Sequence, residues 1–110
     1  GRVVWQGLAS DQLLNPMGSV HAGFAMTLLD SCMSCAVHST LPAGVSYTTL
    51  EVKTNLVKAI TLDTGPVSAE GNIIKVGRRV GTAEGRLMDK QGAVYAFGTA
   101  TCLILGGVTD

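Results

Sequence analysis

The chain has 110 residues, of which 46% are hydrophobic and 15% are charged. This length fits one domain, so residues 1–110 are expected to form a single folded unit. The formal net charge is zero, which gives no general attraction to nucleic acid or to an acidic membrane. Charged residues average about 25% in globular domains. The apolar excess therefore predicts a surface that associates with other subunits.

Few features of the sequence bear on where in the cell the protein is located. No apolar run reaches the ~20 residues that a membrane span needs, and the first residues lack the form of a signal peptide. No initiator Met is present, which leaves open whether residues precede Gly1. Three cysteines, an odd number, argue against a disulfide framework and favour a cytoplasmic location. Cys32 and Cys35 form a C-x-x-C inside a helical pattern, so we expect buried thiols and no metal or redox site.

The first predicted elements are a short strand, a turn and a long helix. Residues 2–8 have the pattern of a strand, and the Asn-Pro-Met-Gly-Ser sequence at 15–19 predicts a turn. The helix is predicted to begin between residues 19 and 21. It should run to about His38, because a Leu-Pro-Ala-Gly sequence follows.

The predicted helix is apolar on every side. Asp30 is its only residue with a full formal charge, whereas a surface helix carries a charged face. We therefore expect the helix to run through the middle of the fold, buried all round. The residues on its apolar stripe are Ala22, Ala25, Met26, Leu29, Met33, Ala36 and Val37, with Phe24, Leu28 and Cys35 on the other side.

Strands follow the helix to the end of the chain. Residues 49–56 alternate, with Leu50 and Val52 expected on the covered side of a sheet. Residues 66–76, 79–88 and 93–105 read as further strands, the last two joined by an Asp-Lys-Gln-Gly hairpin turn. This order predicts an α+β fold, in which an antiparallel sheet of about five strands wraps around one long central helix.

Asp30 is the first candidate for chemistry. An ionised carboxylate in an apolar helix costs several kcal/mol unless it is paired or solvated. Its neighbours on the helix surface are Gly23, Thr27 and Ser34, a stripe of small and polar groups. The stripe, Ser34 included, could line a cleft where a substrate approaches the carboxylate. The alternative is an Asp that hydrogen-bonds a neighbouring loop or a second subunit.

The start of the helix is the second candidate. The first-turn N–H groups of Ala22 and Gly23 have no helical acceptor and lie at the positive end of the helix dipole, where an oxyanion is stabilised. His21 can cap the helix or orient the preceding loop. Asn15 is a common residue before Pro in a turn and can simply satisfy its own backbone.

A basic cluster, Lys75 with Gly77-Arg78-Arg79, falls between two predicted strands. Arg side chains match phosphate oxygens, so the cluster could bind the phosphates of a substrate. It could equally be a solvated turn.

These residues form one pattern when taken together. Asn-Pro-Met-Gly-Ser-Val-His-Ala-Gly at 15–23, Asp30 nine residues after His21, and the segments 47–52 and 77–79 resemble the hotdog-fold thioesterases of the phenylacetate-pathway (PaaI-like) type. In that family an Asn, and a Gly three residues later, precede a His-Gly-Gly that opens a helix with an Asp or Glu. The resemblance covers nearly the whole chain and implies a hotdog fold.

The resemblance also implies an activity. Such an enzyme hydrolyses the thioester of a small aromatic or short- or medium-chain acyl-CoA to the free acid and CoA. Asp30 would act as general base or nucleophile, and the N–H of Ala22 or Gly23 would polarise the thioester carbonyl. No cofactor is expected, because coenzyme A is part of the substrate.

The remaining roles follow from the same resemblance. Asn15 would hold the carbonyl or the attacking water, His21 would fix the loop, and Thr48 would place a hydroxyl near the water. Family active sites form between two subunits, so a homodimer or homotetramer is expected, with no nucleic-acid or membrane partner.

One departure from the family is that Ala22 replaces the first Gly of His-Gly-Gly. Ala keeps the N–H, but a site that needs a positive φ there would be distorted. The alternative function is a non-catalytic acyl-CoA-binding or sensing protein, against which the presence of Asp30, Asn15 and Thr48 counts. A hotdog dehydratase or hydratase uses a different sequence frame, and a purely structural oligomer leaves Asp30 unexplained.

Overall fold

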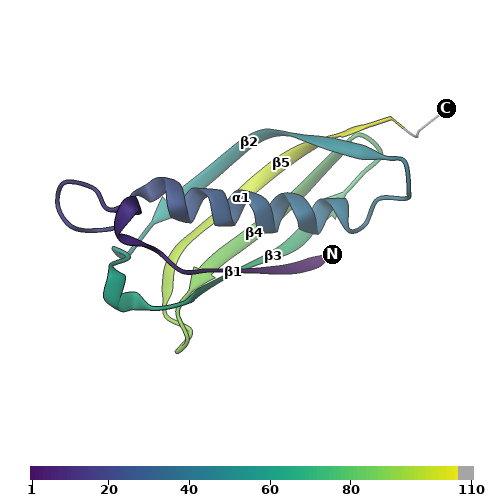
Figure 1. Ribbon diagram of the computed structural model, residues 1–110. Helices are drawn as coiled ribbons and strands as arrows, with labels where there is room; N and C mark the ends of the chain where they lie inside the picture. Colours follow the sequence, from purple (N-terminus) through teal and green to yellow (C-terminus); the bar gives the residue numbers. More distant parts are fainter. Residues whose placement is uncertain (107–110) are drawn as a thin grey trace.

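The computed structural model describes residues 1–106 as one sheet and one long helix, with two short 3-10 turns (Figure 1). The helix and strands follow one another as predicted, one strand first, then the helix, then four strands. The elements are β1 (Arg2–Gly7), a 3-10 turn (Asp11–Leu13), α1 (Ala22–His38), β2 (Ser46–Leu56), a 3-10 turn (Leu62–Thr64), β3 (Val67–Val76), β4 (Val80–Met88) and β5 (Val94–Leu105).

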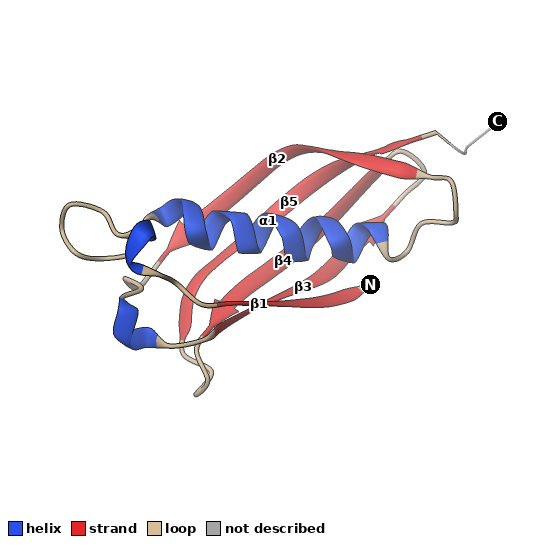
Figure 2. Ribbon diagram, viewed as in Figure 1, coloured by secondary structure: helices blue, strands red, loops and turns tan. Residues whose placement is uncertain are grey.

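The five strands form an antiparallel sheet in the order β1-β3-β4-β5-β2. The helix α1 lies across one face of this sheet, and all the strands lie on the same side of it (Figure 2). This arrangement confirms the predicted α+β fold. No helix within residues 1–106 is long and apolar enough to cross a membrane.

Two glycines of a row across the sheet, Gly71 and Gly85, let α1 approach the sheet closely. Gly71, Gly85 and Gly98 are direct neighbours on β3, β4 and β5. A Cβ on Gly71 would overlap the backbone carbonyl of Cys32, and one on Gly85 would lie 2.9 Å from Cγ of Met33. The rows on either side hold the buried alanines Ala69, Ala83, Ala96 and Ala100, together with the larger buried Leu87. The helix therefore packs against the sheet at nearly backbone distance.

The expectation that α1 is buried all round is wrong for a single chain. The side facing the sheet is buried at Ala25, Leu29, Cys32, Met33, Ser34, Ala36 and Val37. On the other side Met26 is 44% exposed, and Phe24 and Leu28 are only partly buried. One five-stranded sheet covers one side of a helix, so the second apolar side is left for another surface.

A β-bulge in β2 overturns the predicted alternation at Leu50. The pairing of β2 with β5 shifts register between Thr49 and Glu51, so Leu50 is an extra residue. Leu50 is 57% exposed, whereas Thr49 and Val52 point toward the helix side, where they are partly buried. The period-2 pattern could not show this, because one inserted residue reverses every side chain before it.

The hairpin turn between β4 and β5 forms as predicted. The Asp89 carboxylate accepts hydrogen bonds from the backbone N–H groups of Gln91 and Ala93, and Gly92 adopts a positive φ of 87°. These N–H donors hold the pKa of Asp89 below its usual range.

The glycine row gives a first prediction. Gly71→Ala is expected to lower the free energy of unfolding by about 2 kcal/mol or more, because the new methyl group meets backbone that cannot rotate away. Gly77→Ala is the matched control, since the nearest atom to its added Cβ is 3.5 Å away. Urea unfolding of both variants measures the difference, and equal stabilities would show that the helix does not need this close contact.

Candidate active site

A cavity of about 320 Å³ lies at the N-terminal end of α1. One wall comes from the loop before the helix and from its first turn, with Asn15, His21 and Ala22. The facing wall comes from residues 56–60 after β2 and from Tyr95 of β5. Three of the predicted site residues are therefore brought together at one opening.

Asn15 builds the loop on which the cavity depends. Its Oδ1 accepts hydrogen bonds from the N–H groups of Met17 (3.0 Å) and Ser19 (3.1 Å), and its Nδ2 donates to Oγ of Ser19. Gly18 completes the turn with a φ of 83°. Asn15 thus has the structural role that was the alternative for a turn residue. A direct contact between Asn15 and a thioester carbonyl or a water stays a prediction.

His21 is the N-cap residue of α1, but its imidazole makes no capping hydrogen bond. The backbone fixes the loop instead, because the N–H of His21 donates to the carbonyl of Leu13 at 2.8 Å. The loop is tied again where the N–H of Val20 donates to the carbonyl of Ile60 at 2.7 Å. The side chain of His21 is exposed and lines the cavity.

The first two N–H groups of α1 are free donors. Within residues 1–106 the amides of Ala22 and Gly23 donate to no acceptor, whereas the next amide, of Phe24, donates to the carbonyl of His21. Ala22 has no positive φ, since none occurs at a non-glycine residue in residues 1–106. The replacement of the family glycine by Ala22 therefore leaves the helix start unstrained.

Asp30 lies farther along α1, half-buried and held by one neighbour. The hydroxyl of Ser34 donates to Oδ1 of Asp30 at 2.9 Å, and the same hydroxyl lies 3.1 Å from Oγ1 of Thr49 on β2. Ser34 is only 4% exposed. A contact between Ser34 and a substrate stays a prediction. In this structure the hydroxyl of Ser34 is hydrogen-bonded to the Asp30 carboxylate.

A single chain keeps Asp30 apart from the cavity. Asp30 does not line it, and the eight helical steps from Ala22 to Asp30 span about 12 Å along the helix axis. The free N–H groups and the carboxylate are thus two separate parts of the predicted site.

Thr48 and the basic cluster lie away from both parts. Thr48 is exposed on β2, and its neighbour Thr49 is the residue that faces Ser34. Lys75, Gly77, Arg78 and Arg79 are exposed around the β3–β4 turn. The nearby Gly81 packs on Val37, near the C-terminal end of α1. Their predicted roles would require a second subunit.

The sequence analysis missed Lys58 and Thr49. Lys58 lines the cavity, and its Nζ lies 5.0 Å from the ring centroid of Tyr95, whose hydroxyl donates to Asp89. No motif marks a single Lys after a strand, so sequence gave no signal for it. The period-2 alternation predicts Thr49 on the outer side of the sheet, because it cannot show the bulge between Thr49 and Glu51.

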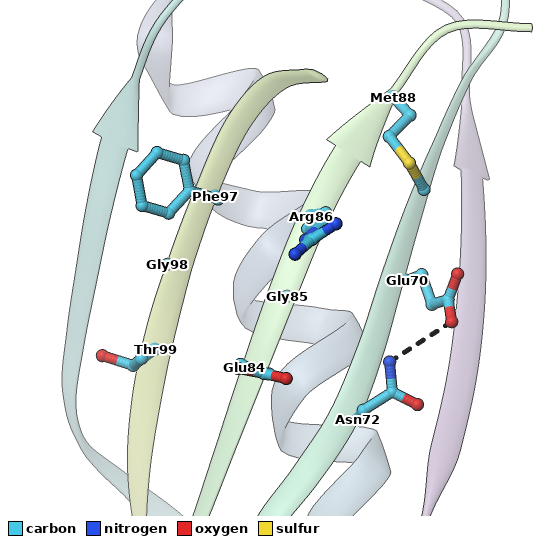
Figure 3. Close-up of a pocket in the computed structure, with 9 residues that line it drawn as sticks. All are labelled: Glu70, Asn72, Glu84, Gly85, Arg86, Met88, Phe97, Gly98 and Thr99. Atoms are coloured by element: carbon cyan, nitrogen blue, oxygen red, sulfur yellow. Dashed lines mark hydrogen bonds between the residues drawn. The ribbon is translucent and has the colours of Figure 1, made fainter. Parts of the chain in front are cut away.

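A second hollow, of about 420 Å³, lies on the helix-free face of the sheet (Figure 3). Figure 3 shows Glu84 and Thr99 on one side of Gly85 and Gly98, and Arg86 and Phe97 on the other. Arg2 pairs with Glu70 at 2.8 Å, and Asn72 donates to the same carboxylate, which holds the pKa of Glu70 below its usual range. None of the predicted site residues lines this hollow.

All three cysteines are free thiols; Cys32 is buried as predicted, whereas Cys35 is only partly buried. Cys32 is buried against the sheet, and burial raises the pKa of its thiol to about 12. Burial also raises the pKa of the Cys102 thiol, beside Ser34 and Thr49. No group of three or more His, Cys, Asp or Glu residues within 1–106 is arranged to hold a metal ion.

Comparisons with known proteins agree with this geometry. A sequence model of the Thioesterase superfamily matches residues 17–96, which include the loop from Met17 onward, α1 and most of the sheet. The chain therefore belongs to the thioesterase superfamily, with the hotdog fold that the sequence pattern predicted.

Individual relatives cover different shares of the chain. A protein from Halobacterium salinarum named "Putative esterase VNG_1336C" is 36% identical over 67 residues, which are 61% of this chain and 44% of the relative. This match thus spans less than half the length of that relative. A phenylacetic acid degradation-related protein from Ralstonia eutropha JMP134 is 28% identical, with a TM-score of 0.85 over 93% of this chain and 75% of the other.

A second similar structure contains a ligand. The BH2602 protein from Bacillus halodurans, crystallised with CoA, is 29% identical, with a TM-score of 0.86 over 93% of this chain and 66% of the other.

The buried thiols give a second prediction. At pH 8 the native protein is expected to react at Cys35 before Cys32 or Cys102, because the raised pKa values and burial of the latter two suppress their thiolates. Iodoacetamide labelling followed by mass spectrometry of peptides measures the order, with denatured protein as the control. Preferential labelling of Cys32 would indicate a reactive C-x-x-C instead.

Proposed function

We propose that the protein is a cytoplasmic acyl-CoA thioesterase in which Asp30 is the general base or nucleophile. The observation that carries the proposal is the environment of Asp30. This carboxylate sits in an apolar helix with a neutral hydroxyl as its partner, and its Oδ2 has no partner within residues 1–106. The Oδ2 atom is not among the buried unpaired oxygens of residues 1–106, so water or a thioester can reach it.

The start of α1 supplies the second element of the proposal. Ala22 lines the cavity, and the free N–H groups of Ala22 and Gly23 lie at the positive end of the helix dipole. Donors fixed in this way stabilise the oxyanion that forms when a thioester carbonyl is attacked.

We infer that the two elements meet across a homodimer, because one chain keeps them about 12 Å apart. The edge strand β2 supports this arrangement. It offers 11 residues of edge backbone with Leu50 and Leu56 exposed, and its residue Thr49 lies next to the Asp30 cluster. A second chain paired along β2 would place its residues next to Asp30. It would also bury the exposed side of α1.

Coenzyme A is proposed as the leaving group. The Bacillus halodurans relative with CoA supports this choice. Lys58 at the cavity, and Lys75, Arg78 and Arg79 at the β3–β4 turn, offer positive charge for its phosphates. The acyl group is proposed to be small and aromatic, or of short to medium chain length. No cofactor is needed, because water is the second substrate.

The proposed reaction has two possible first steps. As a general base, Asp30 takes a proton from water while the water oxygen attacks the carbonyl carbon. As a nucleophile, Asp30 attacks that carbon itself and forms an anhydride, which water then opens. In both cases the tetrahedral intermediate collapses, the C–S bond breaks, and CoA leaves as a thiolate that takes up a proton. A single turnover in ¹⁸O-water separates them, since only the anhydride route places label in the Asp30 carboxylate.

Replacement of Asp30 is the direct test of the proposed function. Asp30→Asn is expected to lower kcat about a thousandfold or more, because the amide is neither a base nor a nucleophile, while the fold is retained. Release of free thiol from a panel of aromatic and straight-chain acyl-CoAs measures turnover. Near-normal turnover by Asp30→Asn would remove Asp30 from the mechanism, and tight binding without turnover by wild type would indicate an acyl-CoA sensor.

Ala22→Pro tests the helix N-terminus separately. Proline suits the first helical position, and the extended ψ of 140° at His21 suits a following proline, so the variant should fold. It lacks the N–H of residue 22, and kcat is expected to fall about a hundredfold if this donor binds the oxyanion.

Ala22→Gly is the matched control for this variant, since it keeps the N–H and should retain activity. A normal kcat in Ala22→Pro would leave the amide of Gly23 as the donor to be tested.

A further inference from the structure

We propose that Thr49, turned inward by the β-bulge of β2, is a positioning residue that holds Asp30 through Ser34 and leaves Oδ2 as the reacting oxygen. This inference rests on the proposed function of Asp30. Thr49 touches neither the substrate nor the carboxylate in this arrangement, and it acts through the hydroxyl of Ser34.

The direction of the hydrogen bonds follows from counting protons. Ser34 has one hydroxyl proton, and it donates that proton to Oδ1 of Asp30 at 2.9 Å. The contact of 3.1 Å between Ser34 and Thr49 then requires Thr49 to be the donor. The chain therefore runs from Thr49 to Ser34 to Asp30, and each bond polarises the next toward the negative charge.

The bulge is what makes this chain possible. Thr49 pairs with Cys102 of β5, but the next paired residue of β2 is Glu51, with Thr101, so Leu50 is inserted between them. With strict alternation from Val52, Leu50 would point toward the helix and Thr49 toward solvent. The inserted residue places the Thr49 hydroxyl within reach of Ser34 and puts Leu50 outside, at 57% exposure. Bulges beside active sites commonly re-aim a side chain in this way.

The consequence for Asp30 is a fixed carboxylate. Ser34 is 4% exposed and sits between α1 and β2, so Oδ1 is anchored to the sheet as well as to the helix. Oδ2 has no partner within residues 1–106 and keeps its lone pairs for water or for the thioester carbon. A reacting group that is already held in the productive orientation does not lose conformational entropy when the reaction takes place.

The first part of the test replaces only the hydroxyl of Thr49. Thr49→Val keeps the shape and is expected to lower kcat about tenfold, with KM changed less than about twofold, since orientation of Asp30 matters for the chemical step. Thr49→Ser restores the hydroxyl and should recover kcat to within about threefold of wild type. Thr99→Val, the same change at an exposed residue of β5, is the matched control.

The second part asks whether Thr49 acts through Ser34. Ser34→Ala is expected to lower kcat at least as much as Thr49→Val, and the double variant should be no slower than Ser34→Ala alone within about twofold. Thermal unfolding of each variant shows that the folded state is compared in every case.

The outcomes separate this inference from the proposed function. Three results would each overturn the positioning role. The first is an unchanged kcat in Thr49→Val, and the second is no recovery of kcat in Thr49→Ser. The third is that Thr49→Val lowers kcat by the same factor in the wild-type protein and in Ser34→Ala. If Asp30→Asn is inactive in the same assays, the proposed function stands even so. Normal turnover by Asp30→Asn would overturn the proposed function, and the role of Thr49 with it.

Discussion

The close packing of α1 against the glycine row of the sheet is the constraint on which the other features depend. Gly71 and Gly85 leave no side chain at the positions of β3 and β4 that face Cys32 and Met33, so the helix lies close to strand backbone there. Interiors are packed to the density of organic crystals, and a contact of this kind leaves little freedom to shift or rotate the helix. The orientation of α1, and hence the direction in which each of its side chains points, is set by this contact.

The chemistry follows from that fixed orientation. With one side of α1 against the sheet, the single charged residue Asp30 comes to the border between the buried and the open side, where Ser34 connects it to β2. The first turn of the same helix carries free N–H groups at the cavity, where Asn15 shapes the loop. One rigid helix thus presents an electrostatic site at its start and a carboxylate two turns later. Their separation in one chain is the reason for placing the complete site between two chains.

Much of the fold could be predicted from sequence, because its signals are local. The apolar helix, the alternating strands and the Asp89 turn are patterns of neighbouring residues, and the structure contains all of them. The resemblance also identified Asn15, His21 and Ala22, which do line one cavity. The errors came from non-local features. Only the pairing of β2 with β5 shows the bulge that exchanges the places of Thr49 and Leu50, and Lys58 joins the cavity through chain folding alone. The exposure of one side of α1 could likewise not be predicted, because the helix sequence is apolar on every side.

The central claim is that the carboxylate of one chain works with the helix start of another. It is tested most directly by unfolding Asp30→Asn and Ala22→Pro chains together, refolding them as a mixture, and assaying acyl-CoA hydrolysis. In a two-fold dimer, half of the randomly assorted pairs contain both variants, and each such pair has one intact site of two. The account predicts about a quarter of wild-type activity in the mixture. Activity no higher than that of the separately refolded variants would contradict it and would place each site within a single chain.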